Sequence, residues 1–232
     1  MTFSLVLLPG LAGDAVMWRH QLEGLPDWQP QVSDVHTRHA TIQEMAAALL
    51  ARHPGPLVLC GASMGGMVAM EAARQSPGRL RGLALLGTSA RPEDDEFRVV
   101  REKAIVLFEQ GRTREVIEPN AAMAFHPLHA RDPRLVADYI DFVLRAGDAQ
   151  LVRQNRAVIA RHDARVRLPL VRCPTLVLCG ADDQLTPPER SREIAALVPG
   201  AELVLLPECG HMLTIEQPDA VNAQLRRWLQ RL

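Results

Sequence analysis

The sequence has no excess of charge of one sign, which excludes one class of function at the outset. Its 26 Lys and Arg residues nearly balance its 27 Asp and Glu residues, so the net charge is −1. This balance argues against a protein that binds nucleic acid through bulk charge. With 47% hydrophobic and 23% charged residues, the composition is that of an ordinary globular protein and not of a disordered or collagen-like chain.

Long hydrophobic runs are also missing. No run reaches the ~18 apolar residues of a membrane-spanning helix, so we expect no membrane partner. The apolar segment at residues 3–8 follows no Lys or Arg and stops at Pro9 and Gly10. A secretory signal needs a basic start and a longer apolar stretch, so we expect none here.

The four cysteines form no Cys-x-x-Cys pair; they are Cys60, Cys173, Cys179 and Cys209. This spacing favours buried free thiols over a disulfide framework or a zinc site. Free thiols are typical of a reducing compartment, and we therefore predict a cytoplasmic protein.

Short apolar runs recur along the 232 residues, and each ends at a glycine, a proline or a polar turn. Brief, nearly continuous apolar runs are typical of strands that are covered on both faces. The predicted strands are Phe3–Leu8, Leu57–Cys60, Leu80–Leu86, Thr175–Cys179 and Glu202–Leu206, with Gln31–Val35 as a weaker candidate.

Helical patterns alternate with these strands. They cover Ile42–Arg52, Met64–Gln75, Pro188–Leu197 and Pro218–Leu232. The alternation predicts an α/β fold with a mostly parallel sheet and helices on both faces.

Residues 92–168, which we call the cap segment, break this rhythm. They contain four helix-like stretches and no clear strand, and Asp132 with Pro133 forms a typical helix start. We expect residues 1–91 and 169–232 to form the core, with the cap segment as a helical cap over the carboxyl edge of the sheet, where ligands bind in open α/β sheets.

The motif Gly61-Ala62-Ser63-Met64-Gly65 lies between a predicted strand and a predicted helix. This is the setting of a nucleophile elbow, in which a sharp turn holds the serine hydroxyl above the sheet. The N-terminus of the following helix favours negative charge that develops at this point. Small residues are common at such turns, so the motif alone does not establish a function.

A serine hydroxyl becomes a nucleophile only when a base takes its proton and an acid holds that base. Asp182 and Asp183 follow the strand at residues 175–179, and His211 follows the strand at residues 202–206. Serine, acid and histidine thus occur in the chain order of this type of fold. Ends of parallel strands share one edge, so we expect these side chains to converge.

An oxyanion hole needs two backbone N–H donors. We assign one to Met64, the residue after the candidate nucleophile, and one to Leu11 in the loop after the first strand. Gly10 would let the backbone of that loop approach a substrate closely.

These motifs together resemble the α/β-hydrolase family, in its small branch with a helical cap. The resemblance implies that Ser63 is the nucleophile, Asp183 rather than Asp182 the acid, and His211 the base. The family often has His where this chain has Pro9, and the chain starts at what resembles the third strand, so a smaller sheet is expected. The matching stretches are residues 7–11, 61–66, 173–175, 180–183, 210–211 and 216–218.

Several other residues have two interpretations. Pocket lining and core packing are both open for Trp18, Met67, Met123 and Met212. Four arginines of the cap segment could form ion pairs at the surface or bind an acidic substrate, and the first interpretation is favoured. They are Arg153, Arg156, Arg161 and Arg165.

The pair His126 and His129 has no accompanying carboxylate or cysteine cluster in the sequence. A solvated loop is therefore favoured over a metal site. His36 and His39 are expected at the surface.

The sequence thus predicts a serine hydrolase that cleaves a small carboxylic ester through an acyl-enzyme on Ser63. The partner is a small-molecule substrate, and no metal or organic cofactor is implied. Hydrolysis of a thioester, a lactone or a C–C bond uses the same residues and stays open, as does a small-molecule receptor on the same fold. The sequence does not indicate the oligomeric state.

Overall fold

A single parallel sheet forms the centre of the molecule in the computed structural model, which describes residues 3–232. Six strands lie in the order β2-β1-β3-β4-β5-β6, and each neighbouring pair is parallel. The strands are β1 (Ser4–Leu8), β2 (Gln31–Val32), β3 (Leu57–Ala62), β4 (Leu80–Leu86), β5 (Thr175–Gly180) and β6 (Glu202–Leu206).

Strand side chains alternate between two buried layers. Leu5 and Leu7 of β1 belong to one hydrophobic cluster, and Val6 and Leu8 belong to the other. The four strands β1, β3, β4 and β5 are almost wholly buried, as their continuous apolar runs predict. Strand β6 is only half-buried, because it forms an edge of the sheet.

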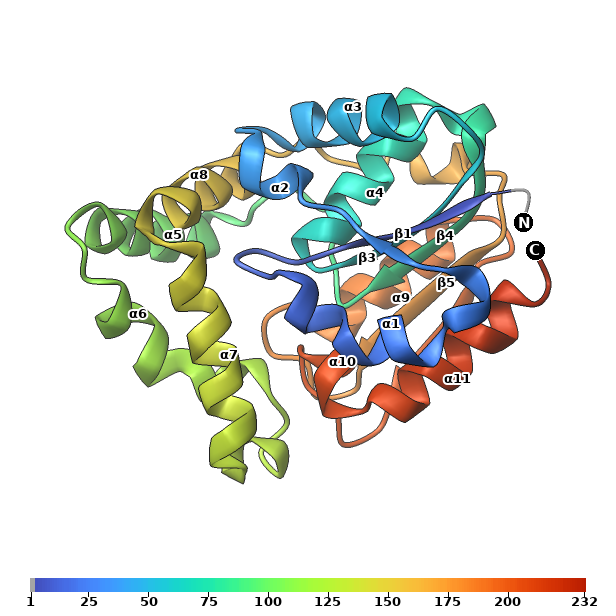
Figure 1. Cartoon of the computed structure of the whole chain (residues 1–232). Helices are drawn as coiled ribbons and strands as arrows, with labels where there is room; N and C mark the ends of the chain where they lie inside the picture. The colour runs from blue at the N-terminus through green and yellow to red at the C-terminus, as the bar shows by residue number, and fades with distance from the viewer. Residues whose placement is uncertain (1–2) are drawn as a thin grey trace.

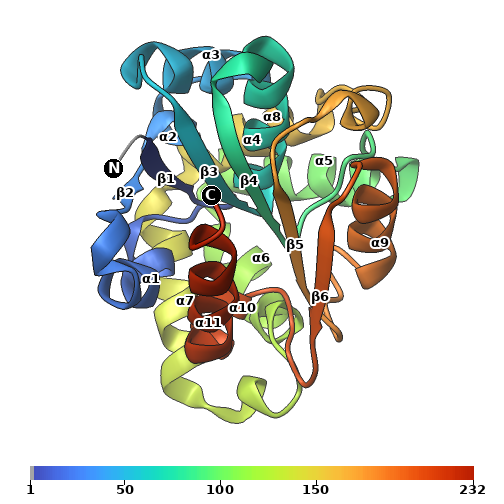
Figure 2. The same ribbon diagram turned by 90° about the vertical axis from the view of Figure 1, so that its right-hand side faces the viewer.

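Helices cover both faces of the sheet, which confirms the predicted fold class (Figure 2). One face carries α1 (Arg19–Gly24), α10 (Leu213–Glu216) and α11 (Pro218–Leu229). The other carries α3 (Ile42–Arg52), α4 (Met64–Gln75) and α9 (Pro188–Leu197). Helix α3 begins with a capping box between Thr41 and Glu44, which satisfies two backbone donors at its first turn.

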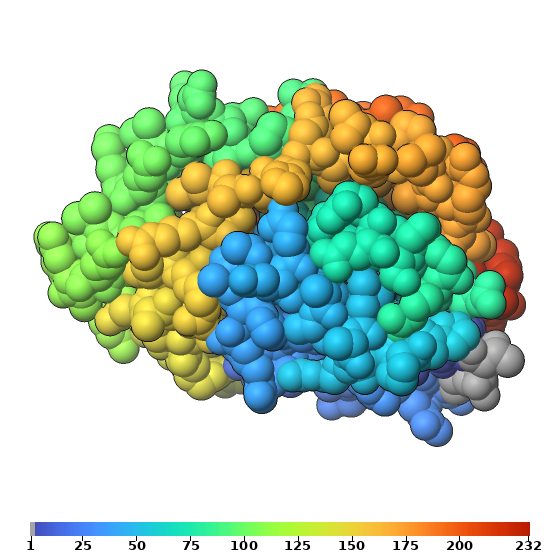
Figure 3. Space-filling model, turned by 90° about the horizontal axis from the view of Figure 1, so that it is seen from above, coloured from blue at the N-terminus to red at the C-terminus, as the bar shows by residue number. Residues whose placement is uncertain are grey.

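The cap segment contains α5 (Asp95–Glu109), α6 (Thr113–Asn120), α7 (Pro133–Ala146) and α8 (Asp148–Ile159). These helices lie beyond the ends of the strands opposite the N-terminus (Figure 1). In the space-filling view the same segment, green to yellow, covers one end of the molecule and meets the blue N-terminal third (Figure 3). Asp132 caps α7 by accepting hydrogen bonds from two backbone N–H groups.

Several elements differ from the prediction: β1 begins one residue later, β3 ends two residues later and β5 ends one residue later than expected. The weak strand at residues 31–35 is only two residues long, because helix α2 (Val35–Arg38) begins within it. The last helix ends at Leu229, before the predicted Leu232. Helix α1 was not predicted, since its six residues show no clear apolar period.

The four cysteines are free thiols, and three of them are buried. Within residues 3–232, no helix is both long enough and apolar enough to span a bilayer.

Candidate active site

Ser63 lies at the turn between β3 and α4 in a conformation that few non-glycine residues adopt. Its φ is 51° and its ψ is −119°. Such a conformation costs on the order of 1–3 kcal/mol and persists only where the surroundings enforce it. The backbone N–H of Ser63 donates to Leu86 O at 2.8 Å, and Thr88 Oγ1 donates to Ser63 O at 2.7 Å. The end of β4 and the loop that follows it therefore hold the elbow.

The glycines around Ser63 are required by close packing. A Cβ at Gly61 would lie 2.3 Å from Gly65 O, and a Cβ at Gly65 would lie 2.1 Å from Leu8 O. Both distances are far below van der Waals contact with backbone atoms that cannot move aside. The Gly-x-Ser-x-Gly spacing thus has a steric reason in this chain.

Asp183 and His211 form a hydrogen-bonded pair. Asp183 follows β5, His211 follows β6, and the two atoms His211 Nδ1 and Asp183 Oδ2 are 2.8 Å apart. The second carboxylate oxygen accepts from the N–H groups of Leu185 at 2.9 Å and Thr186 at 2.8 Å. A proton on Nδ1 leaves Nε2 as the free acceptor of the imidazole. Asp182 instead lies 3.8 Å from His126.

The pair shifts the pKa values of both groups. Burial raises the pKa of Asp183, but the charge of His211 and the bonds from His211 and Thr186 outweigh it, so the net pKa lies below the ordinary value. Burial lowers the pKa of His211, but the charge and hydrogen bond of Asp183 outweigh it, so the net pKa lies above the ordinary value. The arrangement favours an imidazole that gains a proton beside an ionised carboxylate.

Gly87, which follows β4, lies against this pair. With φ at +47°, a Cβ there would be 3.2 Å from Asp183 Oδ2 and 3.5 Å from His211 Nδ1. Since the neighbouring Leu86 O accepts the N–H of Ser63, β4 connects the serine side of the site to the acid–histidine side. Gly87 was not among the residues predicted for the site, although its place directly after a strand was a usable signal.

The loop after β1 approaches Ser63 closely. A Cβ at Gly10 would lie 3.2 Å from Ser63 Cβ, so only glycine leaves this space open. Within the described residues, neither Leu11 N–H nor Met64 N–H donates a hydrogen bond to another protein group. Two backbone donors next to the elbow are therefore available to a negatively charged oxygen.

A buried glutamine from the cap segment holds the same loop. Gln154 on α8 accepts from Ala12 N–H at 2.8 Å and donates to His36 O at 3.0 Å. His36 Nε2 lies 2.7 Å from Gly13 O. Ala12 has a φ of 60°, which a loop held from only one side would rarely keep.

His36 is buried, so the expectation of a surface position is wrong. Its Nε2 must carry the proton, because Gly13 O can only accept. Burial lowers the pKa of His36, in keeping with a neutral ring. The packing of Gln154 over His36 explains the burial, and no local pattern in the sequence shows that contact.

The four residues considered for the pocket lie in different surroundings. Trp18 is fully buried, and Met212 is buried in the same hydrophobic cluster. Met67 is buried in the cluster on the other face of the sheet. The Met123 side chain is 45% exposed.

The cap arginines are largely paired. Arg161 is buried, contacts Glu93 at 2.9 Å, and donates to two carbonyl groups. Arg165 pairs with Asp163 at 2.6 Å. Ion pairing, the favoured interpretation, is thus present at both positions, but the Arg161 side chain is buried and not at the surface as expected.

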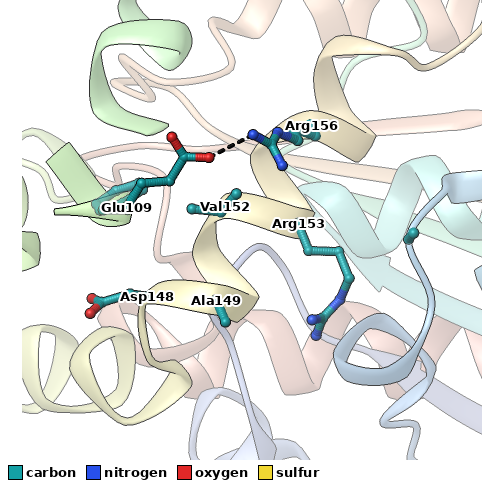
Figure 4. Close-up of a pocket in the computed structure, with 8 residues that line it drawn as sticks. Glu109, Asp148, Ala149, Val152, Arg153 and Arg156 are labelled. Atoms are coloured by element: carbon teal, nitrogen blue, oxygen red, sulfur yellow. Dashed lines mark hydrogen bonds and ion pairs between the residues drawn. The ribbon is translucent and has the colours of Figure 1, made fainter. Parts of the chain in front are cut away.

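Arg153 and Arg156 line a cavity of about 610 Å³ between α5, α8 and the loop at Ala40. Arg156 is directed toward Glu109, and Arg153 is directed away from that pair (Figure 4). The guanidinium of Arg153 donates to Thr37 O. None of the candidate catalytic side chains lines this cavity, so it is not the site of the proposed chemistry.

Arg101 was missed by the sequence analysis. This α5 residue donates to Glu93 at 2.6 Å and to Asn155 at 2.9 Å, and its charge acts to lower the pKa of His211. The cap segment thus contributes a positive charge that opposes protonation of the candidate base. Its sequence context, a charged residue in an ordinary helix, gave no signal.

His126 and His129 are half-buried, so their loop is less solvated than expected. His129 Nδ1 lies 2.9 Å from Glu216 Oε2. Among residues 3–232, no group of three or more His, Cys, Asp or Glu side chains is arranged to bind a metal ion.

The chain is similar to a known protein family and to characterised relatives. Residues 21–218 match the family described as serine aminopeptidase, S33. The RutD protein of Azorhizobium caulinodans, named as a candidate carbamate hydrolase, is 28% identical over 95% of this chain and 89% of its own length.

Solved structures are also similar. An esterase from Thermogutta terrifontis has a TM-score of 0.89 and 29% identity over 99% of this chain and 90% of its own. The enol-lactonase of Burkholderia xenovorans LB400 has a TM-score of 0.88 over 99% of this chain and 92% of its own, and at 23% identity it supports the fold alone.

Proposed function

This chain belongs to the serine aminopeptidase S33 family of α/β-hydrolases, and from that membership we propose that it is a serine hydrolase of small carboxylic esters. The observation that carries the proposal is the strained Ser63 after β3, with the hydrogen-bonded Asp183 and His211 two and three strands away at the carboxyl ends of the same sheet. An ordinary turn serine needs no such strain. A nucleophile that must project above the sheet does.

In the proposed reaction, His211 Nε2 takes the proton of Ser63 Oγ as that oxygen attacks the ester carbonyl. The carbonyl oxygen becomes an oxyanion, held by the N–H groups of Leu11 and Met64. His211 then donates the proton to the leaving alcohol, and water cleaves the acyl-enzyme by the reverse roles. Asp183 holds the ring in the Nδ1–H tautomer and stabilises its cation.

We further propose that residues 92–168 act as a cap over this edge, with residues 1–91 and 169–232 as the core. Cap residues contact both loops of the proposed site: Gln154 binds the loop after β1, and Ala124 O accepts the N–H of His211 at 3.0 Å. Substrate would therefore be bound between the two parts.

A carbamate is a second candidate substrate, because the RutD relatives align along nearly the whole chain. Attack by Ser63 on a carbamate carbonyl would use the same residues. Thioesters, lactones and C–C bonds next to a carbonyl belong to the same test panel.

The test compares wild type with Ser63→Ala on p-nitrophenyl esters, carbamates, thioesters and lactones, together with fluorophosphonate labelling. We expect a drop in turnover on the order of 10⁴-fold or more and loss of labelling in the variant. Equal turnover in both proteins would overturn the mechanism. Tight binding of a small molecule by wild type without turnover would favour a receptor.

A further inference from the structure

Glu216, the last residue of α10, carries a carboxylate that is fully buried next to the candidate base. Its oxygens accept the N–H of Gly210 at 3.0 and 3.1 Å, and Gly210 directly precedes His211. Oε2 also accepts the N–H of His126 at 2.8 Å and lies 2.9 Å from Nδ1 of His129. One side chain thus joins the histidine loop to two residues of the cap segment.

The backbone contacts at this point are equally close. Ala124 O accepts the N–H of His211 at 3.0 Å and that of Met212 at 3.1 Å. A Cβ at Gly210 would lie 2.5 Å from the nitrogen of His126. Residues 124–129, which we call the latch segment, therefore lie in direct contact with the loop that carries the imidazole.

We propose that Glu216 is a positioning residue of the reaction, whose carboxylate fastens the His211 loop to the latch segment and so fixes the imidazole for proton transfer. The inference rests on the proposed function, since it assigns Glu216 a part in the same site. Glu216 acts through the loop, and no contact with the reacting atoms is required.

A buried carboxylate that accepts several hydrogen bonds fixes the positions of the groups that donate them. Removing it leaves the N–H groups of Gly210 and His126 without their acceptor, and an unsatisfied buried donor costs about 1–3 kcal/mol. The loop can recover those bonds only by moving toward water or toward another acceptor. Either movement displaces His211.

Glu216 also acts on His211 through its charge. After burial, which lowers the pKa of His211, the raising influences come from Asp183 and then Glu216, and the charge of Arg101 opposes them. His129 is the ionisable side chain in direct contact with Glu216. Loss of the Glu216 charge therefore lowers the pKa of His211.

The experiment uses the full chain and p-nitrophenyl acetate, with kcat, KM and the pH profile of kcat/KM measured per fluorophosphonate-titrated site. Glu216→Gln removes the charge, and Glu216→Asp keeps the charge but shortens its reach. His129→Ala removes the cap donor, whereas His129→Asn keeps a donor near the position of Nδ1. Glu115→Gln is the matched control, since Glu115 is an exposed cap carboxylate paired with Arg112.

In Glu216→Gln we expect kcat to fall about 10–100-fold with little change in KM, as for a misplaced catalytic group. The acid limb of the pH profile of kcat/KM moves to lower pH in this variant, because the pKa of His211 is lower without the Glu216 charge. In Glu216→Asp kcat falls and the limb stays near that of wild type. His129→Ala loses a few-fold in kcat, because one of the hydrogen bonds to the Glu216 carboxylate is lost, and His129→Asn recovers it.

Two results would overturn this inference and leave the proposed function standing. In the first, Glu216→Gln has the same kcat and the same acid limb as wild type. In the second, its loss of activity is explained entirely by a smaller number of titratable sites in a less stable protein. Thermal unfolding of each variant separates the second case. If wild type itself neither labels at Ser63 nor cleaves any ester, the proposed function fails, and this inference fails with it.

Discussion

The core and the cap segment contribute to the candidate site in different ways. Ser63, Asp183 and His211 each follow a core strand directly, so their positions depend on the register of neighbouring strands. The cap contacts, by contrast, join residues far apart in the sequence, as in the bond from Ala12 to Gln154, 142 positions away. The candidate catalytic residues can therefore be found from local sequence patterns, whereas the contacts that align them depend on tertiary packing.

The largest effect is expected for a substitution in the core, at the candidate acid Asp183. Asp183→Asn removes the charge that stabilises the imidazolium and favours the wrong tautomer of His211. We expect kcat to fall on the order of 10³–10⁴-fold while the fold is retained, measured by ester hydrolysis and thermal unfolding.

Asp182→Asn is the matched control, because Asp182 lies next in the chain but faces His126. Near-wild-type turnover is expected for it. A larger loss in Asp182→Asn than in Asp183→Asn would reverse the assignment of the acid.

A smaller effect is expected from the cap side. Gln154→Ala leaves Ala12 N–H and His36 O without their partner, so the loop that carries Leu11 is less well held. We expect kcat to fall about tenfold, because Ala12 N–H, the group that Gln154 holds in the loop of Leu11, loses its acceptor, with a loss of stability of about 1–3 kcal/mol.

Gln150→Ala, one turn earlier on the same helix, is the control for helix propensity and should behave like wild type. If the two variants are indistinguishable in kcat, the cap does not align the oxyanion loop.

The smallest effect is expected from a charge in the cap segment that acts on the pKa of His211. Arg101 acts to lower the pKa of His211, so Arg101→Gln raises it. The base must be neutral to take the serine proton, and the acid limb of kcat/KM therefore moves to higher pH.

Arg98→Gln, on the same helix but half-exposed, is the control and should leave the limb in place. This shift is opposite in sign to the one expected for Glu216→Gln. A shift of the Arg101 variant to lower pH would contradict the placement of this charge near the base.

Local patterns predicted much of the core. The helices Ile42–Arg52, Met64–Gln75 and Pro188–Leu197 agree residue for residue with the structure, because each is bounded by a proline, a polar cap or a strand. The strand at residues 31–35 was too long in the prediction, since an edge strand has a neighbour on one side only and α2 takes over its end.

The polar contacts between the two parts could not be predicted. Gln154 and His36 look like ordinary helix residues, and their roles arise only when α8 packs over α2, 118 positions away in the chain. Glu216 was noted as part of a resemblance, yet its buried position depends on the latch segment folding against it. Such contacts leave no repeating pattern in the sequence, because each of them joins a single pair of residues.

The cap segment leaves the sheet after β4 and returns at β5, and these two strands are neighbours. Its two attachment points are therefore adjacent, and an exchange of the whole segment would leave the strand order untouched. Under the proposed function, exchange of the segment between relatives would change the residues around the substrate and keep the strand ends that precede Ser63, Asp183 and His211. A successful graft would still have to bring its own partners for Ala12 and Glu216, and this requirement limits which chimaeras can be productive.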